Sequence, residues 1–214
     1  MTASRDSDPV TPTGPDGLVI RPANEAEPND LQAIFGTRGS AAICQCQRFK
    51  LARGEAFGNF PVEERRRRLV EQTGAGDPDA ETTSGLVAWL GGEPAGWCAV
   101  EPRAAYGGLR RNQKVPWTGR DEDKADASVW AITCVFVRAG RRGQGIAHAL
   151  AAAAVAHAGA SGAAAVEAYP IITSAGERIT WDEIHPGTPS MYAAAGLTEV
   201  SHPFPRRLVM RRDF

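Results

Sequence analysis

Short apolar runs, separated by polar or glycine-rich segments, recur along the chain from Leu18 onward. Runs rich in β-branched and aromatic residues predict strands, here at residues 18–22, 85–90, 95–101, 128–137, 164–170, 197–200 and 207–211. The second and third runs flank a Gly-Gly-Glu-Pro turn, which predicts an antiparallel hairpin. The run at 128–137 is almost continuously apolar, which is typical of a central strand covered on both faces.

Helical periodicity, capping residues and glycine stops predict four helices between these strands. They are expected at residues 31–35 after a cap at Asn29 or Asp30, at 62–70 after a cap at Asn59 and before a stop at Gly74, at 146–158, and at 189–195 before a stop at Gly196. The helix at 146–158 would face the sheet with Ile146, Leu150 and Ala153, and it joins two strands, which predicts a crossover between parallel strands. Residues 106–127 are polar and interrupted by glycine and proline, so we expect a surface loop there.

Four consecutive arginines, Arg65 to Arg68, lie in the second predicted helix. They are open to two interpretations, a phosphate-binding surface or a solvated helix face. Glu63 and Glu64 precede Arg67 and Arg68 by four residues, the spacing of ion pairs along a helix. This spacing favours exposed ion pairs.

Composition and charge limit the classes of function. The chain has 214 residues, of which 43% are hydrophobic, enough for one domain at 18–214 after a polar, disordered tail at 1–17. Lys and Arg number 24 against 25 Asp and Glu, so we expect neither nucleic acid nor an anionic membrane as a partner. No run of about 18 apolar residues is present and the first residues are polar, so we expect a cytoplasmic protein without a membrane span or signal peptide.

The most informative segment runs from Arg138 to Ala147, where the apolar strand gives way to a helix. The first turn of a helix exposes backbone N–H groups, and glycines let a pyrophosphate approach that backbone. A glycine-rich structural turn is the alternative. A dinucleotide-binding motif would require glycine where His148 stands, and a nucleotide P-loop would require Gly-Lys-Ser/Thr.

Arg142-Gly143-Gln144-Gly145-Ile146-Ala147 resembles the acetyl-CoA-binding motif of the GNAT superfamily of N-acetyltransferases, Arg/Gln-x-x-Gly-x-Gly/Ala, and matches it at every fixed position. The resemblance implies an α/β (α+β) fold with a mixed, mostly antiparallel central sheet, helices on both faces, and a V-shaped opening between the strands of Val135 and Val166. It implies that the pyrophosphate contacts the N–H groups of residues 142–147. It also implies that pantetheine pairs with the strand backbone at Cys134, Val135, Phe136 and Val137.

Transfer of an acyl group from a thioester to an amine requires a base for the amine and a proton for the leaving thiolate. The stretch from Ser190 to Leu197 resembles the family segment Leu/Phe-Tyr-x-x-x-Gly-Phe, with Leu197 in place of phenylalanine, which makes Tyr192 the candidate general acid. Glu101, at a strand end, is the first candidate base, and Glu167 is the second. The alternative for all three is a structural or surface role.

The acceptor side is less defined by the sequence. Cys44-Gln45-Cys46 lacks the further ligands of a zinc site, so we expect no metal, reduced thiols and a role in lining the acceptor pocket or in packing. Trp181 to His185 is a candidate substrate wall, and the apolar run from Leu208 to Met210 is open to two interpretations, a homodimer edge or a strand buried within the monomer. We expect no acetyl-cysteine intermediate, although Cys134 near the thioester leaves that route open.

The predicted function is direct, acetyl-CoA-dependent acetylation of an amine on a small molecule. Two alternatives remain at this point: a non-catalytic acyl-CoA-binding regulatory module, and acetylation of a macromolecular amine such as a protein N-terminus, a lysine or an aminoacyl-tRNA.

Overall fold

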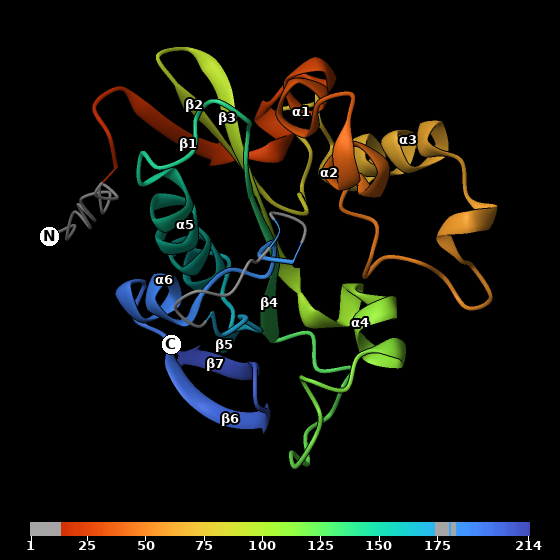
Figure 1. Cartoon of the computed structure of the whole chain (residues 1–214), viewed down its shortest axis with the longest axis vertical. Helices are drawn as coiled ribbons and strands as arrows, with labels where there is room; N and C mark the ends of the chain where they lie inside the picture. The colour runs from red at the N-terminus through yellow and green to blue at the C-terminus, as the bar shows by residue number, and fades with distance from the viewer. Residues whose placement is uncertain (1–13, 174–179, 181–182) are drawn as a thin grey trace, which may run out of the picture.

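The computed structural model describes residues 14–173, 180 and 183–214, and Figure 1 shows their arrangement. These residues form a seven-stranded sheet in the order β1-β2-β3-β4-β5-β7-β6. The strands are β1 (Leu18–Pro22), β2 (Leu86–Leu90), β3 (Glu93–Pro102), β4 (Val129–Val137), β5 (Ala165–Ala168), β6 (Thr198–Phe204) and β7 (Arg207–Asp213). Only β4 and β5 pair in parallel, as the crossover predicts, and β4 occupies the centre of the sheet.

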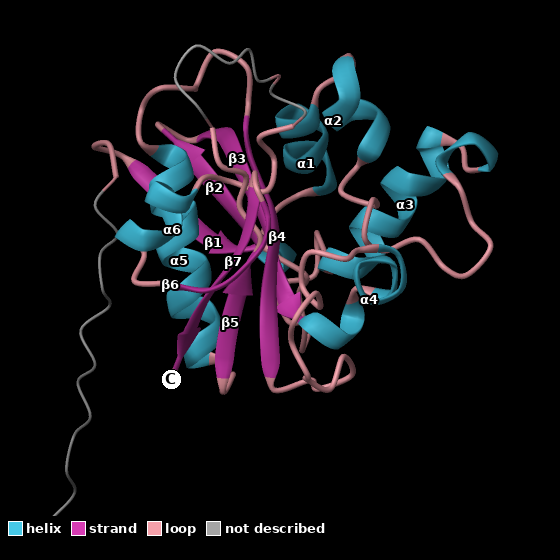
Figure 2. Cartoon of the chain, turned by 60° about the horizontal axis from the view of Figure 1, so that its bottom comes forward, coloured by secondary structure: helices cyan, strands magenta, loops and turns pink. Residues whose placement is uncertain are grey.

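Helices cover both faces of this sheet (Figure 2). They are α1 (Pro28–Phe35), α2 (Gly39–Cys44), α3 (Val62–Thr73), α4 (Gly107–Asn112), α5 (Ile146–Ala160) and α6 (Pro189–Ala194), with 3-10 turns at Ala23–Glu25, Phe57–Asn59 and Arg103–Ala105. Helices α5 and α6 cover one face, and α1 to α4 lie on the other. The expected fold class is therefore confirmed. None of the helices in the described ranges is long and apolar enough to cross a bilayer.

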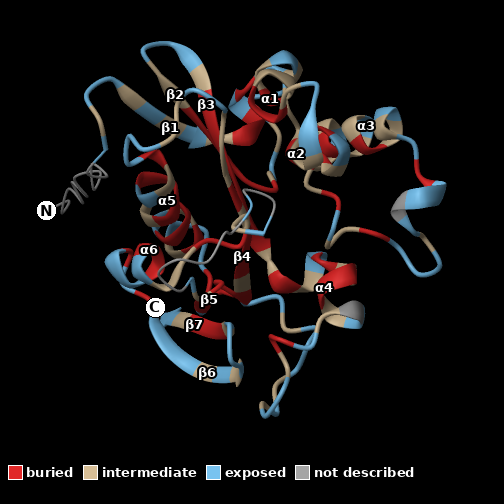
Figure 3. Ribbon diagram, viewed as in Figure 1, coloured by how far each residue is buried: buried red, intermediate tan, exposed pale blue. Residues whose placement is uncertain are grey.

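The core on the α5 face depends on close approach between helix and sheet. Ile146, Leu150 and Ala154 are buried against the strands, whereas Ala153, expected at the interface, is half-buried. Gly96 on β3 lies directly beneath the helix, where a Cβ atom would come within 2.9 Å of the Leu150 side chain. Small residues on both elements let the backbones approach closely, and the buried residues run along the whole helix (Figure 3).

The opposite face holds two apolar clusters. One is built on α1 and the hairpin and includes Trp97, and the other includes Tyr106, Leu109, Ala131 and Val209. Tyr106, Leu109 and a third member, Val115, belong to the segment 106–127, for which a surface loop was predicted; that prediction is wrong for residues 106–115 and correct for the exposed and half-buried residues 118–127. Gly108 donates a backbone hydrogen bond to Phe49 O (2.8 Å). This contact between residues distant in sequence holds the segment where its apolar side chains pack with Phe49 against the sheet.

Strand β4 changes its pairing halfway along its length. Its ladder with β5 covers Val129–Ile132 against Ala165–Ala168 and ends there. On the other side, Ala99 pairs with Cys134 and Val100 with Ile132, so Thr133 is an extra residue in β4. Such a bulge bends a strand and redirects its side chains. The carboxyl half of β4 is therefore not paired with β5, as the expected V-shaped opening requires.

One predicted helix start and one predicted cap are wrong. Helix α1 begins at Pro28 with Glu27 as its cap, and Asp30 accepts a hydrogen bond from the Glu27 N–H (3.3 Å) from the third helical position. Helix α3 begins at Val62 and stops at Gly74, both as predicted, but its cap is Pro61 instead of Asn59. In both helices a proline with a preset φ occupies or precedes the first turn, which decides where the helix begins.

The interpretation of Leu208 to Met210 as a homodimer edge is also wrong. Strand β7 lies between β5 and β6, and Leu208, Val209 and Met210 are buried. The outer strand is β6, because the chain crosses beyond β5 before it returns. Residues 1–13 of the predicted disordered tail lie outside the described part of the chain.

Candidate active site

A cavity of about 410 Å³ lies between the carboxyl half of β4, the loop at residues 138–145 and the first turn of α5. Gly143 and Gly145 line it, and both have positive φ values (+76° and +78°) that favour glycine. A Cβ atom at either position would meet no described atom within 4 Å, so the glycines keep open space over the helix start. Gly145 is the N-cap residue of α5, and no side chain in the described residues caps this end.

The uncapped end makes the cavity electropositive. The first N–H groups of a helix have no partner within the helix and carry its positive dipole end. The side chains of Arg141 and Arg142 also line the cavity. Arg142 Nε donates a hydrogen bond to Val137 O (3.2 Å), and its guanidinium lies 5.8 Å from the centre of the Phe136 ring. Backbone and side chains together therefore suit an anion such as a pyrophosphate.

The four β4 residues predicted to contact pantetheine do not all face the opening. Val135 N–H donates to His185 O (2.8 Å), and Val137 O accepts from Arg142, so the backbone groups of these two residues point away from β3. Because backbone direction alternates along a strand, those of Cys134 and Phe136 point toward β3. Val135 and Val137 are therefore the two whose backbone groups border the cavity.

A segment that the sequence did not single out for this position, residues 184–187, closes one side of the cavity. Ile184 and Gly187 line it, together with Met191 from α6. Trp181 and Asp182, from the predicted substrate wall, lie outside the described residues. His185, from the same wall, lies with its ring 6.5 Å from that of Phe49. A Pro-Gly pair after a polar run indicates a turn in sequence, but not that this turn meets β4.

Tyr192 is completely buried directly behind the cavity lining. Its hydroxyl donates a hydrogen bond to Pro186 O (3.0 Å), and a Cβ atom on Gly187 would come within 2.7 Å of its ring. Burial raises the pKa of Tyr192 well above its usual value, so the hydroxyl keeps its proton at neutral pH. The residue can hold a proton next to the cavity, and releasing it requires exchange of the hydrogen bond to Pro186.

Glu101 lies on the opposite face of the sheet from α5, near the β4 bulge. It forms an ion pair with Lys50, and each of the two side chains is only 10% exposed. The Lys50 ammonium lies 4.8 Å from the centre of the Tyr106 ring. Burial raises the pKa of Glu101, and the charge of Lys50 opposes that rise. A carboxylate with a raised pKa is suited to accept a proton.

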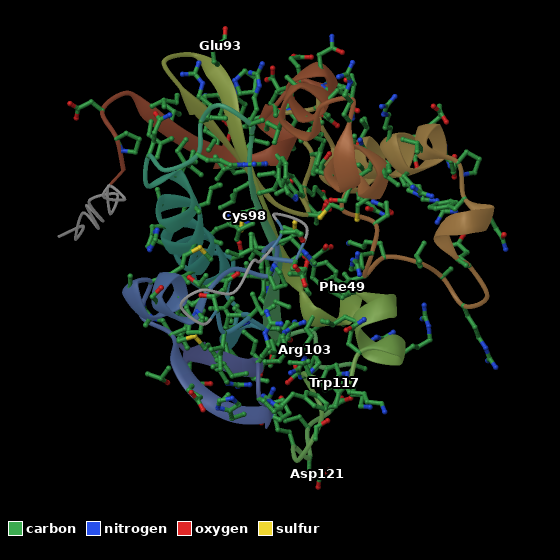
Figure 4. All side chains as sticks on the ribbon, viewed as in Figure 1. Phe49, Glu93, Cys98, Arg103, Trp117 and Asp121 are labelled. Carbon is green, nitrogen blue, oxygen red and sulfur yellow. The ribbon has the colours of Figure 1, made fainter. Side chains whose placement is uncertain are left out.

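Glu167, the second candidate base, belongs instead to a buried network. Its carboxylate pairs with Arg103 (3.1 Å), Arg211 (3.1 Å) and Arg120, and it accepts a hydrogen bond from Tyr169 Oη (3.0 Å). Figure 4 labels Arg103 and Trp117, whose ring centre lies 5.0 Å from the guanidinium carbon. With its oxygens engaged in this way, Glu167 ties the segment after β3 to the sheet.

Two of the cysteines, Cys46 and Cys134, lie on the face of the sheet opposite α5. Trp97 Nε1 donates to Cys46 Sγ (3.2 Å), and Cys46 and Cys134 pack against the same apolar cluster. A hydrogen bond from Cys134 is the largest effect that lowers the pKa of Cys46. In the described part of the chain, no three His, Cys, Asp or Glu side chains come together as a metal site requires.

Several solved structures share this fold. A GCN5-related N-acetyltransferase from Kribbella flavida is 17% identical, with a TM-score of 0.51 over 94% of this chain and 99% of that one. A ribosomal-protein-alanine N-acetyltransferase from Brucella melitensis is 18% identical, with a TM-score of 0.50 over 92% of this chain and 99% of that one. A phosphinothricin acetyltransferase from Sinorhizobium meliloti, solved in complex with AcCoA, is 18% identical, with a TM-score of 0.50 over 92% and 89%.

The comparison with protein-family models is stronger evidence for the family than these distant structural similarities. No curated protein sequence matches the chain. The model of the acetyltransferase (GNAT) family matches residues 49–174, more than half of the chain, from the segment before α3 through β4, the glycine loop, α5 and β5. With the fold, the glycine loop and this match in agreement, the chain belongs to the acetyltransferase (GNAT) family.

Proposed function

We propose that residues 18–214 form one domain that transfers an acetyl group from acetyl-CoA directly to an amine of a small molecule. The observation that carries this proposal is the uncapped start of α5, bordered by Gly143 and Gly145, which opens into the 410 Å³ cavity beside the separated half of β4. The volume is in the range of cavities that hold cofactors. When bound, acetyl-CoA supplies an activated thioester.

The fit of the coenzyme to this cavity follows from its donors. The pyrophosphate would accept hydrogen bonds from N–H groups of Arg142, Gly143, Gln144, Gly145, Ile146 and Ala147, with the guanidinium of Arg141 nearby. The pantetheine arm would lie along β4, where the backbone of Val135 and Val137 borders the cavity. The Val135 N–H is already bonded to His185 O, so an extended, amide-rich chain would pair with the remaining backbone groups of this strand edge.

Two residues carry proton transfer in this proposal. Glu101 accepts the proton of the incoming amine, directly or through a water molecule, while Lys50 holds its carboxylate in place. Tyr192 supplies a proton to the departing thiolate from behind Gly187. The two lie on opposite sides of β4, which suits an acceptor and a donor that approach from opposite faces of the sheet.

The enclosed setting of Glu101 supports a small acceptor. Its side chain and that of Lys50 are 10% exposed, and the segment around Phe49 covers them together with α4. A protein segment or a tRNA end would need a wider approach than this setting offers. Transfer to a macromolecular amine is therefore the less favoured alternative.

Calorimetric titration with acetyl-CoA tests the proposal. Gly145→Asp places a side chain and a negative charge at the helix start, and we expect it to abolish binding that the unchanged protein shows. Gly162→Asp is the matched control, because Gly162 lies just beyond the other end of α5 with the same φ of +78° and equally open surroundings. Loss of binding in the Gly145 variant alone supports the site. Absence of binding to the unchanged protein would refute the proposed function.

A further inference from the structure

Arg207, at the start of β7, differs from three other buried or half-buried arginines of this region in its charge partners. Arg103, Arg120 and Arg211 all pair with Glu167. Arg207 pairs with no carboxylate among the described residues, and its Nη2 donates to the backbone carbonyl of Tyr169 (2.9 Å). Its Nε is buried and has no hydrogen-bond partner within the described ranges. Most of its five N–H groups therefore remain available to a ligand.

The position of this guanidinium is energetically unfavourable without an anion. Burial lowers the pKa of Arg207, and in the described part of the chain no neighbouring charge opposes the effect. A partly buried cation without a counter-ion destabilises a fold, so such groups are retained mainly where they bind something. A bound anion would supply the negative charge that this guanidinium lacks.

Arg207 also lines a small cavity on the face of the sheet opposite α5. The cavity measures about 10 Å³, the room of a single oxygen atom, and its wall includes Phe49, Thr133, Tyr169 and Pro186. Thr133 is the bulged residue of β4, and Pro186 accepts the hydrogen bond of Tyr192. The cavity therefore lies at the V-shaped opening, close to where the proposed transfer takes place.

Arg207 and Glu101 face the same side of the sheet. Arg207 lies two residues before Val209, which packs with Ala131 and Tyr169 on the α4 face. Glu101 lies two residues after Ala99, which packs on the same face with Trp97. Since side chains alternate along strands, a carboxylate on β3 and a cation on β7 flank the β4–β5 opening from either side.

We propose that Arg207 anchors a carboxylate of the acceptor, so that the substrates are amines that also carry a carboxylate group. This inference rests on the proposed function and adds the chemical class of its acceptor. A planar carboxylate matches the fork of a guanidinium, with one oxygen entering the small cavity. The amine end of the acceptor would then lie toward Glu101.

Acetylation of paired substrates tests the inference. The twenty standard amino acids, 4-aminobutyrate and 6-aminohexanoate are each compared with their carboxamides, with acetyl-CoA as donor. For at least one pair, we expect the unchanged protein to acetylate the acid with a kcat/KM at least tenfold above that of the amide. Arg207→Gln, which keeps a donor for the Tyr169 carbonyl, should remove this preference through a 10- to 100-fold higher KM for the acid. It should leave the rate with the amide unchanged.

Two further variants separate a charge effect from a folding defect. Arg207→Lys keeps the positive charge and should restore part of the preference for acids. Arg21→Gln removes an exposed arginine on β1, far from this cavity, and should change neither rate. If Arg207→Gln fails to fold, the lysine variant decides in its place. Its ratio of kcat/KM for the acid to kcat/KM for the amide is then compared with the same ratio in the unchanged protein.

Calorimetry with acetyl-CoA distinguishes the two ways of failing. All Arg207 variants should bind acetyl-CoA as the unchanged protein does. Binding with equal transfer to acids and amides, or an equal loss on both in Arg207→Gln, would overturn the inference and leave the proposed function standing. A protein that does not bind acetyl-CoA, or that acetylates no member of any pair, would overturn the inference; only the absence of binding would refute the function itself.

Discussion

The hydroxyl of Tyr192 on α6 donates a hydrogen bond to the carbonyl oxygen of Pro186, at a distance of 3.0 Å. The neighbouring residue, His185, accepts a hydrogen bond from Val135 N–H on β4 (2.8 Å). Two consecutive carbonyl groups therefore tie the candidate acid on one side and the strand beside the cavity on the other. The segment at residues 184–187 couples these two parts of the site.

Replacement of Tyr192 by phenylalanine should separate catalysis from packing. The ring stays in its buried position, but the proton is lost, so we expect kcat to fall by about 100-fold or more. The KM for acetyl-CoA should change little, and stability should fall by about 1 kcal/mol through the lost hydrogen bond. Steady-state kinetics across pH and urea denaturation measure both effects. An unchanged rate with an unchanged pH profile would leave Tyr192 with a structural role only.

The ion pair of Glu101 and Lys50 predicts a specific pH dependence. Activity needs the ionised carboxylate, so kcat/KM should fall as pH falls through the raised pKa of Glu101. Lys50→Met removes the charge that lowers this pKa, and the acid limb of the profile should move to higher pH. Glu101→Gln should reduce activity at every pH and remove the limb. A limb that stays at the same pH in Lys50→Met would assign it to another group.

Glu167→Gln should act on stability. The change leaves Arg103, Arg120 and Arg211 without their shared, fully buried partner, so we expect the free energy of unfolding to fall by about 3–5 kcal/mol. The more exposed Glu122, whose side chain is 31% accessible, provides the control, and Glu122→Gln should cost less. Urea denaturation measures both. A Glu167 variant that folds normally yet loses activity would make this residue the base.

Two of the four arginines of α3, Arg65 and Arg67, should differ sharply in how much stability the protein loses when each is replaced. Arg65 is 4% exposed and donates hydrogen bonds to the carbonyl groups of Ile43 and Phe60, so Arg65→Met should destabilise the protein by about 2 kcal/mol. Arg67 pairs with Glu64 and Glu71 on the exposed side of the helix, and Arg67→Met should cause no measurable change. Equal melting temperatures of the two variants would contradict this difference.

Local sequence predicted the elements that depend on local chemistry. Local patterns correctly predict the β-branched strand β1, the hairpin of β2 and β3, and the strand, glycine loop and helix at β4 and α5. The prediction of solvated ion pairs in α3 is correct only in part, because Arg67 and Arg68 pair on the surface while Arg65 is buried. The cytoplasmic location stays a prediction.

Contacts between distant segments decided the rest. The sequence alone determined the strands, the glycine loop and the family to which that loop pointed, because periodicity and backbone freedom are properties of neighbouring residues. Only the tertiary structure placed Lys50 against Glu101, Pro186 against Tyr192, and Arg207 beside the bulge at Thr133. Such pairings arise where strands far apart in the chain lie side by side in the sheet, and no local pattern encodes which side chains then meet.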